Sequence, residues 1–114
     1  MKPLMIVDGA NVMGSVPDGW WRDRRAAAER LRDSLVVQEK EYDVVLVVEG
    51  AARGIDSIPG VPVHAAQGSG DDAIVVLVAA AHDRRCVVVT ADRGLRRRVM
   101  DLGAEVIGPR SIRG

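Results

Sequence analysis

The sequence contains no phenylalanine, and aromatic residues make up only 3% of it, so a folded interior has to be built from Val, Ala and Leu. It contains one cysteine, Cys86, so it cannot form an internal disulfide, and the lack of a disulfide framework is typical of a reducing compartment. Because Cys86 begins the apolar run CVVV, we predict a buried structural thiol rather than a nucleophile.

Long hydrophobic runs are also absent. The longest, 73–81, is far shorter than the roughly 20 residues that a membrane-spanning helix needs. The opening residues MKPLMIV contain one Lys, and Asp8 ends their apolar stretch, so they do not resemble a signal peptide. We therefore expect a cytoplasmic protein in which residues 1–114 form a single domain, a length that allows one independent core.

Short Val-rich segments alternate with helical patterns along the chain. The segments are continuously apolar, as is typical of strands covered on both faces, and they lie at 4–7, 44–48, 61–63, 86–89 and 106–107. Apolar spacing predicts helices at 20–40, 71–83 and 92–102. Asp18 is the expected cap of the first helix, and the box-like start Ser69-x-x-Asp72 favours a helix over a strand for the second. The alternation predicts a three-layer α/β/α sandwich with a mainly parallel central sheet.

Acidic residues follow most of these predicted strands. Asp8 ends the run LMIV, Glu49 follows VVLVV, and Asp92 comes after CVVVTA. Asp71 and Asp72 open the helix that follows VPVH. In a parallel sheet all carboxyl ends meet at one edge, where open α/β folds keep their binding sites. We therefore expect side chains far apart in the sequence to converge on one carboxylate cluster.

Such a cluster has to hold protons or a cation. Two carboxylates about 4 Å apart repel by roughly 4 kcal/mol at an effective dielectric constant of about 20. All the candidate ligands are hard oxygens, and neither His64 nor His82 has a partner at ligand spacing, so the expected ion is Mg²⁺ or Mn²⁺. Such an ion can activate water for attack on phosphorus. Asn11 is placed to orient a carboxylate or a water through its amide.

Each acid also has a simpler interpretation. The pair Asp8-Gly9 is a common turn. The dipole of a helix favours Asp71 and Asp72 in its first turn, and Asp92 could act only as a helix cap. The shared edge favours the metal site over these separate explanations.

Arginine outnumbers lysine by 14 to 2, and its planar fork is the better phosphate ligand. The formal net charge is zero, but if a cation neutralises the acids, the remaining surface is positive and suits a nucleic-acid backbone. A solvated helix face would give the same pattern. Trp20 and Trp21 are expected to anchor the first helix, with stacking on a base as the alternative. The candidate phosphate ligands are Arg22, Arg24 and Arg25 near the first helix and Arg93, Arg96 and Arg97 on the helix at 92–102.

Three motifs in order resemble the NYN domains of the PIN-like ribonuclease superfamily, with the YacP-like branch the most similar. They are VDGAN at the first strand end, GDD at the start of a central helix and VVTAD at a later strand end. The resemblance spans about residues 4–107. Each motif alone is short and common, whereas the ordered set is more specific.

The resemblance implies a metal-dependent RNA endonuclease that leaves 3′-hydroxyl and 5′-phosphate ends. A ribosome or a toxin–antitoxin partner is compatible with that class. At the end of the second strand this chain has Glu49, where the YacP-like branch often has Asp. The segment after residue 107 is shorter than in many YacP-like proteins, which implies a reduced RNA surface or a homodimer. By matching position, the metal ligands would be Asp8, Asp71 and Asp92, the amide Asn11 and a frequent second acid Asp72.

Two other functions remain open from the sequence. The segment GSGDDA fits G-x-G-x-x-A between a strand and a helix, as in a dinucleotide-binding module, and Asp92 lies near the distance of a ribose-binding acid. That interpretation directs Asp71 and Asp72 at a pyrophosphate and leaves VDGAN without a role. The third function is a PIN-like module that binds RNA or another partner without cleaving it. The full set of acids favours the endonuclease.

Overall fold

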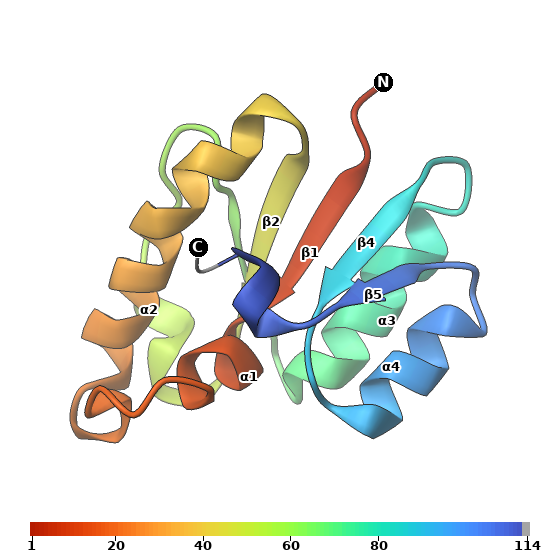
Figure 1. Ribbon diagram of the computed structural model, residues 1–114. Helices are drawn as coiled ribbons and strands as arrows, with labels where there is room; N and C mark the ends of the chain where they lie inside the picture. The colour runs from red at the N-terminus through yellow and green to blue at the C-terminus, as the bar shows by residue number, and fades with distance from the viewer. Residues whose placement is uncertain (113–114) are drawn as a thin grey trace.

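Residues 1–112 are described by a computed structural model, in which five parallel strands form one sheet with helices on both faces (Figure 1). The strand order is β3-β2-β1-β4-β5, so the first strand lies in the centre. The register aligns Ile6 with Val45 on one side and with Val88 on the other. This architecture confirms the predicted α/β/α sandwich. The strands are β1 (Leu4–Asp8), β2 (Asp43–Val48), β3 (Val63–Ala65), β4 (Cys86–Val89) and β5 (Glu105–Ile107).

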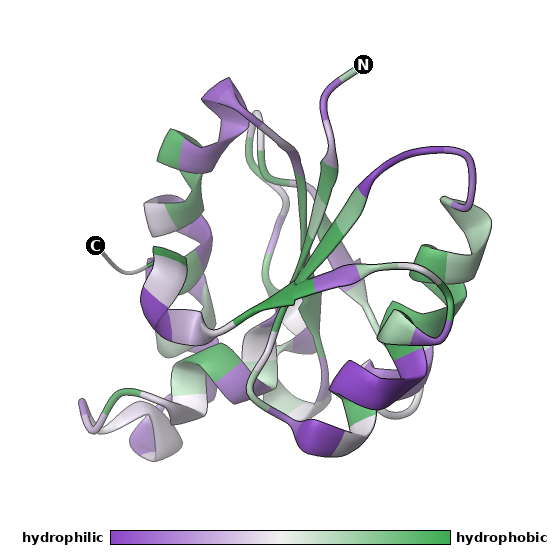
Figure 2. Cartoon of the chain, turned by 45° about the vertical axis from the view of Figure 1, so that its right-hand side comes forward, coloured by the Kyte–Doolittle hydropathy of each residue, from purple (hydrophilic) through white to green (hydrophobic). Residues whose placement is uncertain are grey.

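The helices divide between the two faces because alternate strand residues point to opposite sides of a sheet. Met5 and Val7 pack in the core beneath α1 (Gly9–Gly14) and α2 (Arg24–Ser34). Ile6 packs in the opposite core, beneath α3 (Gly70–Ala80) and α4 (Arg93–Met100). Figure 2 shows apolar strands in the middle and hydrophilic residues on the outer helix surfaces. Among residues 1–112, no helix is both long and apolar enough to cross a bilayer.

The predicted helix at 20–40 is broken into three pieces. The 3₁₀ helix η1 (Trp20–Arg22) comes first, α2 follows, and a second 3₁₀ helix, η2 (Leu35–Lys40), ends the segment. Asp23 interrupts the helix with a non-helical backbone and caps α2, since its carboxylate accepts a 3.0 Å hydrogen bond from Ala26 N. The prediction that Asp18 caps the long helix is therefore wrong. Asp18 accepts a 3.2 Å hydrogen bond from Trp20 N and stabilises η1.

Two other boundaries differ from the predictions. β3 begins at Val63 rather than Val61, because Val61 exchanges backbone hydrogen bonds with Ile58 in a small antiparallel bridge. The short helix α1 begins directly after Asp8, where Asp-Gly predicts only a turn. Further 3₁₀ helices are η3 (Gly50–Gly54), after β2, and η4 (Pro109–Ile112), after β5.

Two local predictions are confirmed. α3 begins as the box-like motif predicts, because Ser69 Oγ accepts a 3.2 Å hydrogen bond from Asp72 N. Cys86 is buried at the start of β4, and its burial raises the pKa of the thiol above its ordinary value. The thiol is therefore a structural group of the core.

Close packing between α1 and β2 gives a test of the fold. A Cβ on Gly9 would lie 2.5 Å from the carbonyl oxygen of Val47, a backbone atom of a central strand that cannot move aside cheaply. We predict that Gly9→Ala lowers the free energy of unfolding by about 1–3 kcal/mol or prevents folding, as overpacked cores do. Urea unfolding measures the effect. Gly68→Ala is the matched control, because a Cβ there meets nothing within 4 Å. Equal midpoints for the two variants would contradict the packing described.

Candidate functional site

The candidate site lies where the strand order reverses. From β1 the chain continues to β2 on one side, while β4 lies on the other side of β1. In open α/β sheets this reversal, outside the carboxyl ends of the two strands, is the usual crevice for a ligand. Asp8 is the last residue of β1, and Thr90 and Asp92 directly follow β4. The fold thus brings residues about eighty positions apart to one crevice.

Asp8 is a buried carboxylate with two hydrogen-bond donors. Only 4% of its surface is exposed. Thr90 Oγ1 donates to its Oδ2 at 2.8 Å, and the backbone N–H of Asn11 donates to its Oδ1 at 3.4 Å. Burial raises the pKa of Asp8 from 3.8 to about 6, against the lowering effect of both hydrogen bonds, and the charges of Asp71 and Glu49 raise it further. The carboxylate is mostly ionised at neutral pH, but its charge is poorly solvated.

Thr90 and Asn11 tie the β4–α4 loop to Asp8 and its helix. Thr90 is fully buried, and its Oγ1 donates to Asp8 and accepts a 3.1 Å hydrogen bond from Asp92 N. Asn11 Oδ1 accepts a 2.8 Å hydrogen bond from Ala91 N. The side-chain oxygen of Asn11 is therefore occupied. Its NH₂ group donates to no group within residues 1–112 and is therefore available to donate to water or to a ligand.

Three further acids surround Asp8. Burial raises the pKa of Asp71, the charges of Asp92 and Glu49 raise it further, and Arg98 opposes the shift. Glu49 follows β2, and its Oε1 lies 3.1 Å from where a Cβ on Gly70 would stand, at the start of α3. Asp92 caps α4, since its Oδ1 accepts a 2.8 Å hydrogen bond from Leu95 N. The carboxylates therefore come from four elements and lie close enough to repel one another.

The donor set suits a hard divalent cation, although it is not assembled around one point. Within residues 1–112, no three His, Cys, Asp or Glu side chains are grouped closely enough to hold a metal ion. All the converging donors are carboxylate oxygens, the ligands that Mg²⁺ and Mn²⁺ prefer. Burial first and mutual repulsion second raise the pKa values of Asp8 and Asp71, and a cation would oppose both effects. The chemistry fits, and binding would require the side chains to turn toward a shared position.

Asp72 faces a different part of the surface. Its side chain is 72% exposed, and its Oδ1 accepts a 3.0 Å hydrogen bond from Arg98 Nη2. It lines a hollow with His64 and Gln67 beside α3, and Asp8 is not part of that hollow. The sequence contains no local signal for this pairing, because Arg98 lies on another helix. The structure thus separates Asp72 from the carboxylates nearest Asp8.

The six arginines predicted to bind phosphate divide into three groups. Arg93, Arg96 and Arg97 line a hollow of about 250 Å³ on the exposed face of α4, which Figure 2 shows as strongly hydrophilic. The guanidinium of Arg24 lies 5.4 Å from the centre of the Trp20 ring, and that of Arg22 lies 5.8 Å from the centre of the Trp21 ring. Arg25 is used structurally, because its Nη2 donates to the carbonyl of Gly54 at 3.1 Å and holds η3 against α2.

Neutralising Asp8 should change how stability depends on pH. Because the folded pKa of about 6 exceeds the unfolded value of 3.8, the folded state binds the proton more tightly. The stabilisation that the Asp8 proton gives to the folded state is present below about pH 4 and is lost as the pH rises through 6. The loss in the free energy of unfolding is about 3 kcal/mol. Asp8→Asn removes the charge and keeps an acceptor for Thr90.

We therefore predict that, relative to the wild type, Asp8→Asn gains up to about 3 kcal/mol of stability between pH 4 and pH 8. Urea unfolding in EDTA at the two pH values measures this. Taking the difference between the two proteins cancels the other titrating groups. A difference that does not vary with pH would show that Asp8 is not held in a poorly solvated position.

Comparison with solved structures identifies the fold. A structure of Rae1 (YacP) from Bacillus subtilis matches with a TM-score of 0.78 at 20% sequence identity, covering 94% of this chain and 69% of that chain. A tryptophan-to-leucine variant of the same protein matches with a TM-score of 0.77 at 18% identity, covering 96% of this chain and 72% of that one. No protein-family model and no curated protein sequence matches the chain. The chain therefore has the fold of Rae1 (YacP).

Proposed function

We propose that the chain is a metal-dependent RNA endonuclease that hydrolyses phosphodiester bonds with Mg²⁺ or Mn²⁺. The observation that carries the proposal is the buried carboxylate of Asp8 at the reversal of strand order, where burial and then the charges of neighbouring acids raise its pKa. A carboxylate in that position is stabilised most by a cation. The PIN-like nuclease fold supports the same function.

The residues around Asp8 have distinct roles in this proposal. Asp8, Asp71 and Asp92 would hold the ion, with Glu49 beside them. When bound, the ion supplies an activated water and neutralises charge on the reacting phosphate. Thr90 fixes the orientation of Asp8, and Asn11 presents its NH₂ group as a donor to a phosphate oxygen. We leave Asp72 out of the ligand set, because Arg98 already pairs with it.

The surface on α4 would carry the RNA backbone. Arg93 directly follows Asp92, and Arg96 and Arg97 lie in the same hollow one turn further along the helix. A phosphate chain that leaves the acidic crevice along α4 would therefore meet three exposed guanidinium groups. Such contacts bind nucleic acid without reading its sequence.

The dinucleotide-binding alternative loses support from the topology. The segment GSGDDA follows β3, which lies at the edge of the sheet and not where the strand order reverses. Asp71 and Asp72 occupy the first turn of α3, where a pyrophosphate would have to bind. The inert RNA-binding module keeps one argument in its favour, because the carboxylates within residues 1–112 are not already grouped around a metal position.

Asp8→Asn tests the proposed chemistry. We predict that wild-type protein cuts labelled single-stranded RNA in Mn²⁺, and that the variant cuts no faster than wild type in EDTA. Mn²⁺ should also raise the melting temperature of the wild type by several degrees, through binding to the folded state, and leave the variant unchanged. Wild-type protein that binds RNA but leaves it uncut in Mn²⁺ would indicate the inert module. Undiminished cutting by the variant would reject the assignment of Asp8.

Arg96→Gln tests the RNA surface. A lost phosphate contact should reduce the slope of log affinity against log salt by about 1 and weaken binding to all RNA sequences alike. Fluorescence anisotropy over a range of salt concentrations measures the slope. Lys40→Gln is the matched control, since it removes one positive charge just before β2, at the amino end of that strand and so away from the carboxyl ends where the site lies. Equal slopes for both variants would place the RNA elsewhere.

A further inference from the structure

A cavity that the proposed mechanism does not use opens beside Glu49. Its volume is about 280 Å³, and its walls include Met13, Trp20, Arg24, Glu49 and Ala52. Small-molecule sites usually begin near 300 Å³, so the cavity suits one small ring system and not a helix or a strand. Because Glu49 also lies beside Gly70 and raises the pKa of Asp8, the cavity is a neighbour of the acidic crevice.

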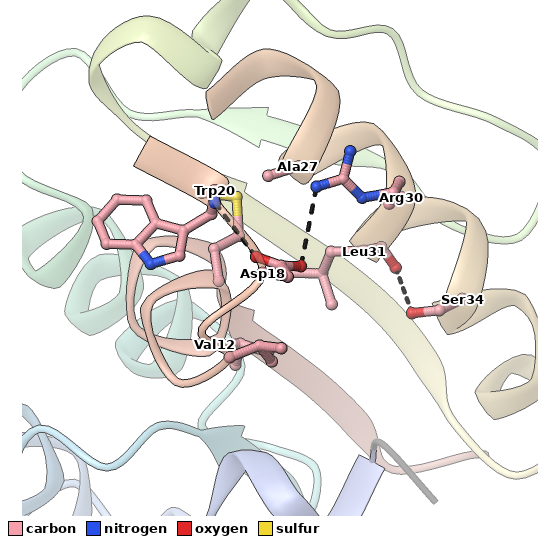
Figure 3. Close-up of a pocket in the computed structure, with 9 residues that line it drawn as sticks. Val12, Asp18, Trp20, Ala27, Arg30, Leu31 and Ser34 are labelled. Atoms are coloured by element: carbon pink, nitrogen blue, oxygen red, sulfur yellow. Dashed lines mark hydrogen bonds and ion pairs between the residues drawn. The ribbon is translucent and has the colours of Figure 1, made fainter. Parts of the chain in front are cut away.

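Trp20 gives this cavity a fixed aromatic wall. The ring is half-buried against the core and lies edge-to-face with Trp21, with centroids 6.0 Å apart. Arg24 lies over it at 5.4 Å. Trp20 also borders a second cavity of about 170 Å³ between α1 and α2, drawn in Figure 3, where its indole points away from the ion pair of Asp18 and Arg30. The indole is thus held in place without being enclosed.

The chemistry of the walls selects the kind of ligand. An indole and a guanidinium plane both stack on flat rings. A carboxylate only accepts hydrogen bonds and repels phosphate, so the group near Glu49 has to carry N–H donors, and the charge of Arg24 in the same wall favours a neutral group over a cation. An aliphatic chain would leave Glu49 and Arg24 without partners. A nucleobase can stack on Trp20 and Arg24 and donate hydrogen bonds to Glu49.

We propose that this cavity binds an unpaired base of the RNA next to the phosphate in the acidic crevice, with guanine preferred. Guanine presents two neighbouring N–H donors on its pairing edge, which match the two oxygens of the Glu49 carboxylate, whereas uracil presents one. The position next to a cleaved phosphate rests on the proposed function. The base preference does not, because it can be measured without cleavage.

The test compares two adjacent tryptophans. Binding of a U-tract RNA and of the same RNA with one G is measured by anisotropy in EDTA for wild type, Trp20→Leu and Trp21→Leu. Wild type and Trp21→Leu should prefer the G-containing RNA, and Trp20→Leu should lose roughly tenfold or more of that affinity, as expected for one stacked base. Equal binding of both RNAs by the wild type, or equal loss in both variants, would overturn the proposal.

Two further variants keep the test decisive if Trp20→Leu does not fold. Arg24→Leu should weaken binding of the G-containing RNA, and Glu49→Gln should lower the preference for G over U; failure of both would overturn the proposal. Cut sites are then mapped in Mn²⁺. Cuts beside G in the wild type that spread over other positions in the variants support the proposal. If every protein cuts RNA without regard to base identity, the endonuclease proposal is supported and the base-site proposal is rejected. If the wild type binds G-containing RNA selectively but does not cut it, the base-site proposal is supported and the endonuclease proposal is rejected.

Discussion

The hydrogen bond from Thr90 to Asp8 is the contact on which the site depends. It joins the carboxyl ends of the two central strands and fixes a charge within the core. The same hydroxyl accepts from Asp92 N, and Asn11 accepts from Ala91 N, so one small network sets the position of the whole β4–α4 loop. Because these hydrogen bonds share Asp8, Asn11 and Thr90, a small displacement of one strand would disturb several of them together.

The buried charges of the site lower the stability of the fold that holds them. Burying the Asp8 carboxylate at the end of β1 disfavours its charged form, and the raised pKa of Asp8 reflects that cost. Burial and neighbouring acids also raise the pKa of Asp71, and the charge of Arg98 opposes that shift. Charged groups with pKa values perturbed by burial are typical of functional sites, where a bound ligand or a reaction uses the charge that lowers the stability of the fold.

The sequence predicted the sheet well, because β1, β2 and β4 are apolar apart from Asp8 and Asp43 at the strand ends and leave little choice of structure. It predicted that Asp8 and Asp92 share an edge for the same reason: parallel strands end together. It could not predict where single side chains point. Asp23 replaced Asp18 as the cap of α2 through a local backbone change, and Asp72 turned toward Arg98, a partner that only the packing of α3 on α4 brings near.

The length of chain between Asp8 and Thr90 has a consequence for when the protein can act. Strand β4 and Thr90 take their places beside β1 only after the first ninety or so residues are available, so a chain that stops before Thr90 cannot assemble the site. Contacts so distant in sequence form late and slowly during folding. In the proposed endonuclease, the acids could therefore not come together until synthesis has passed Thr90.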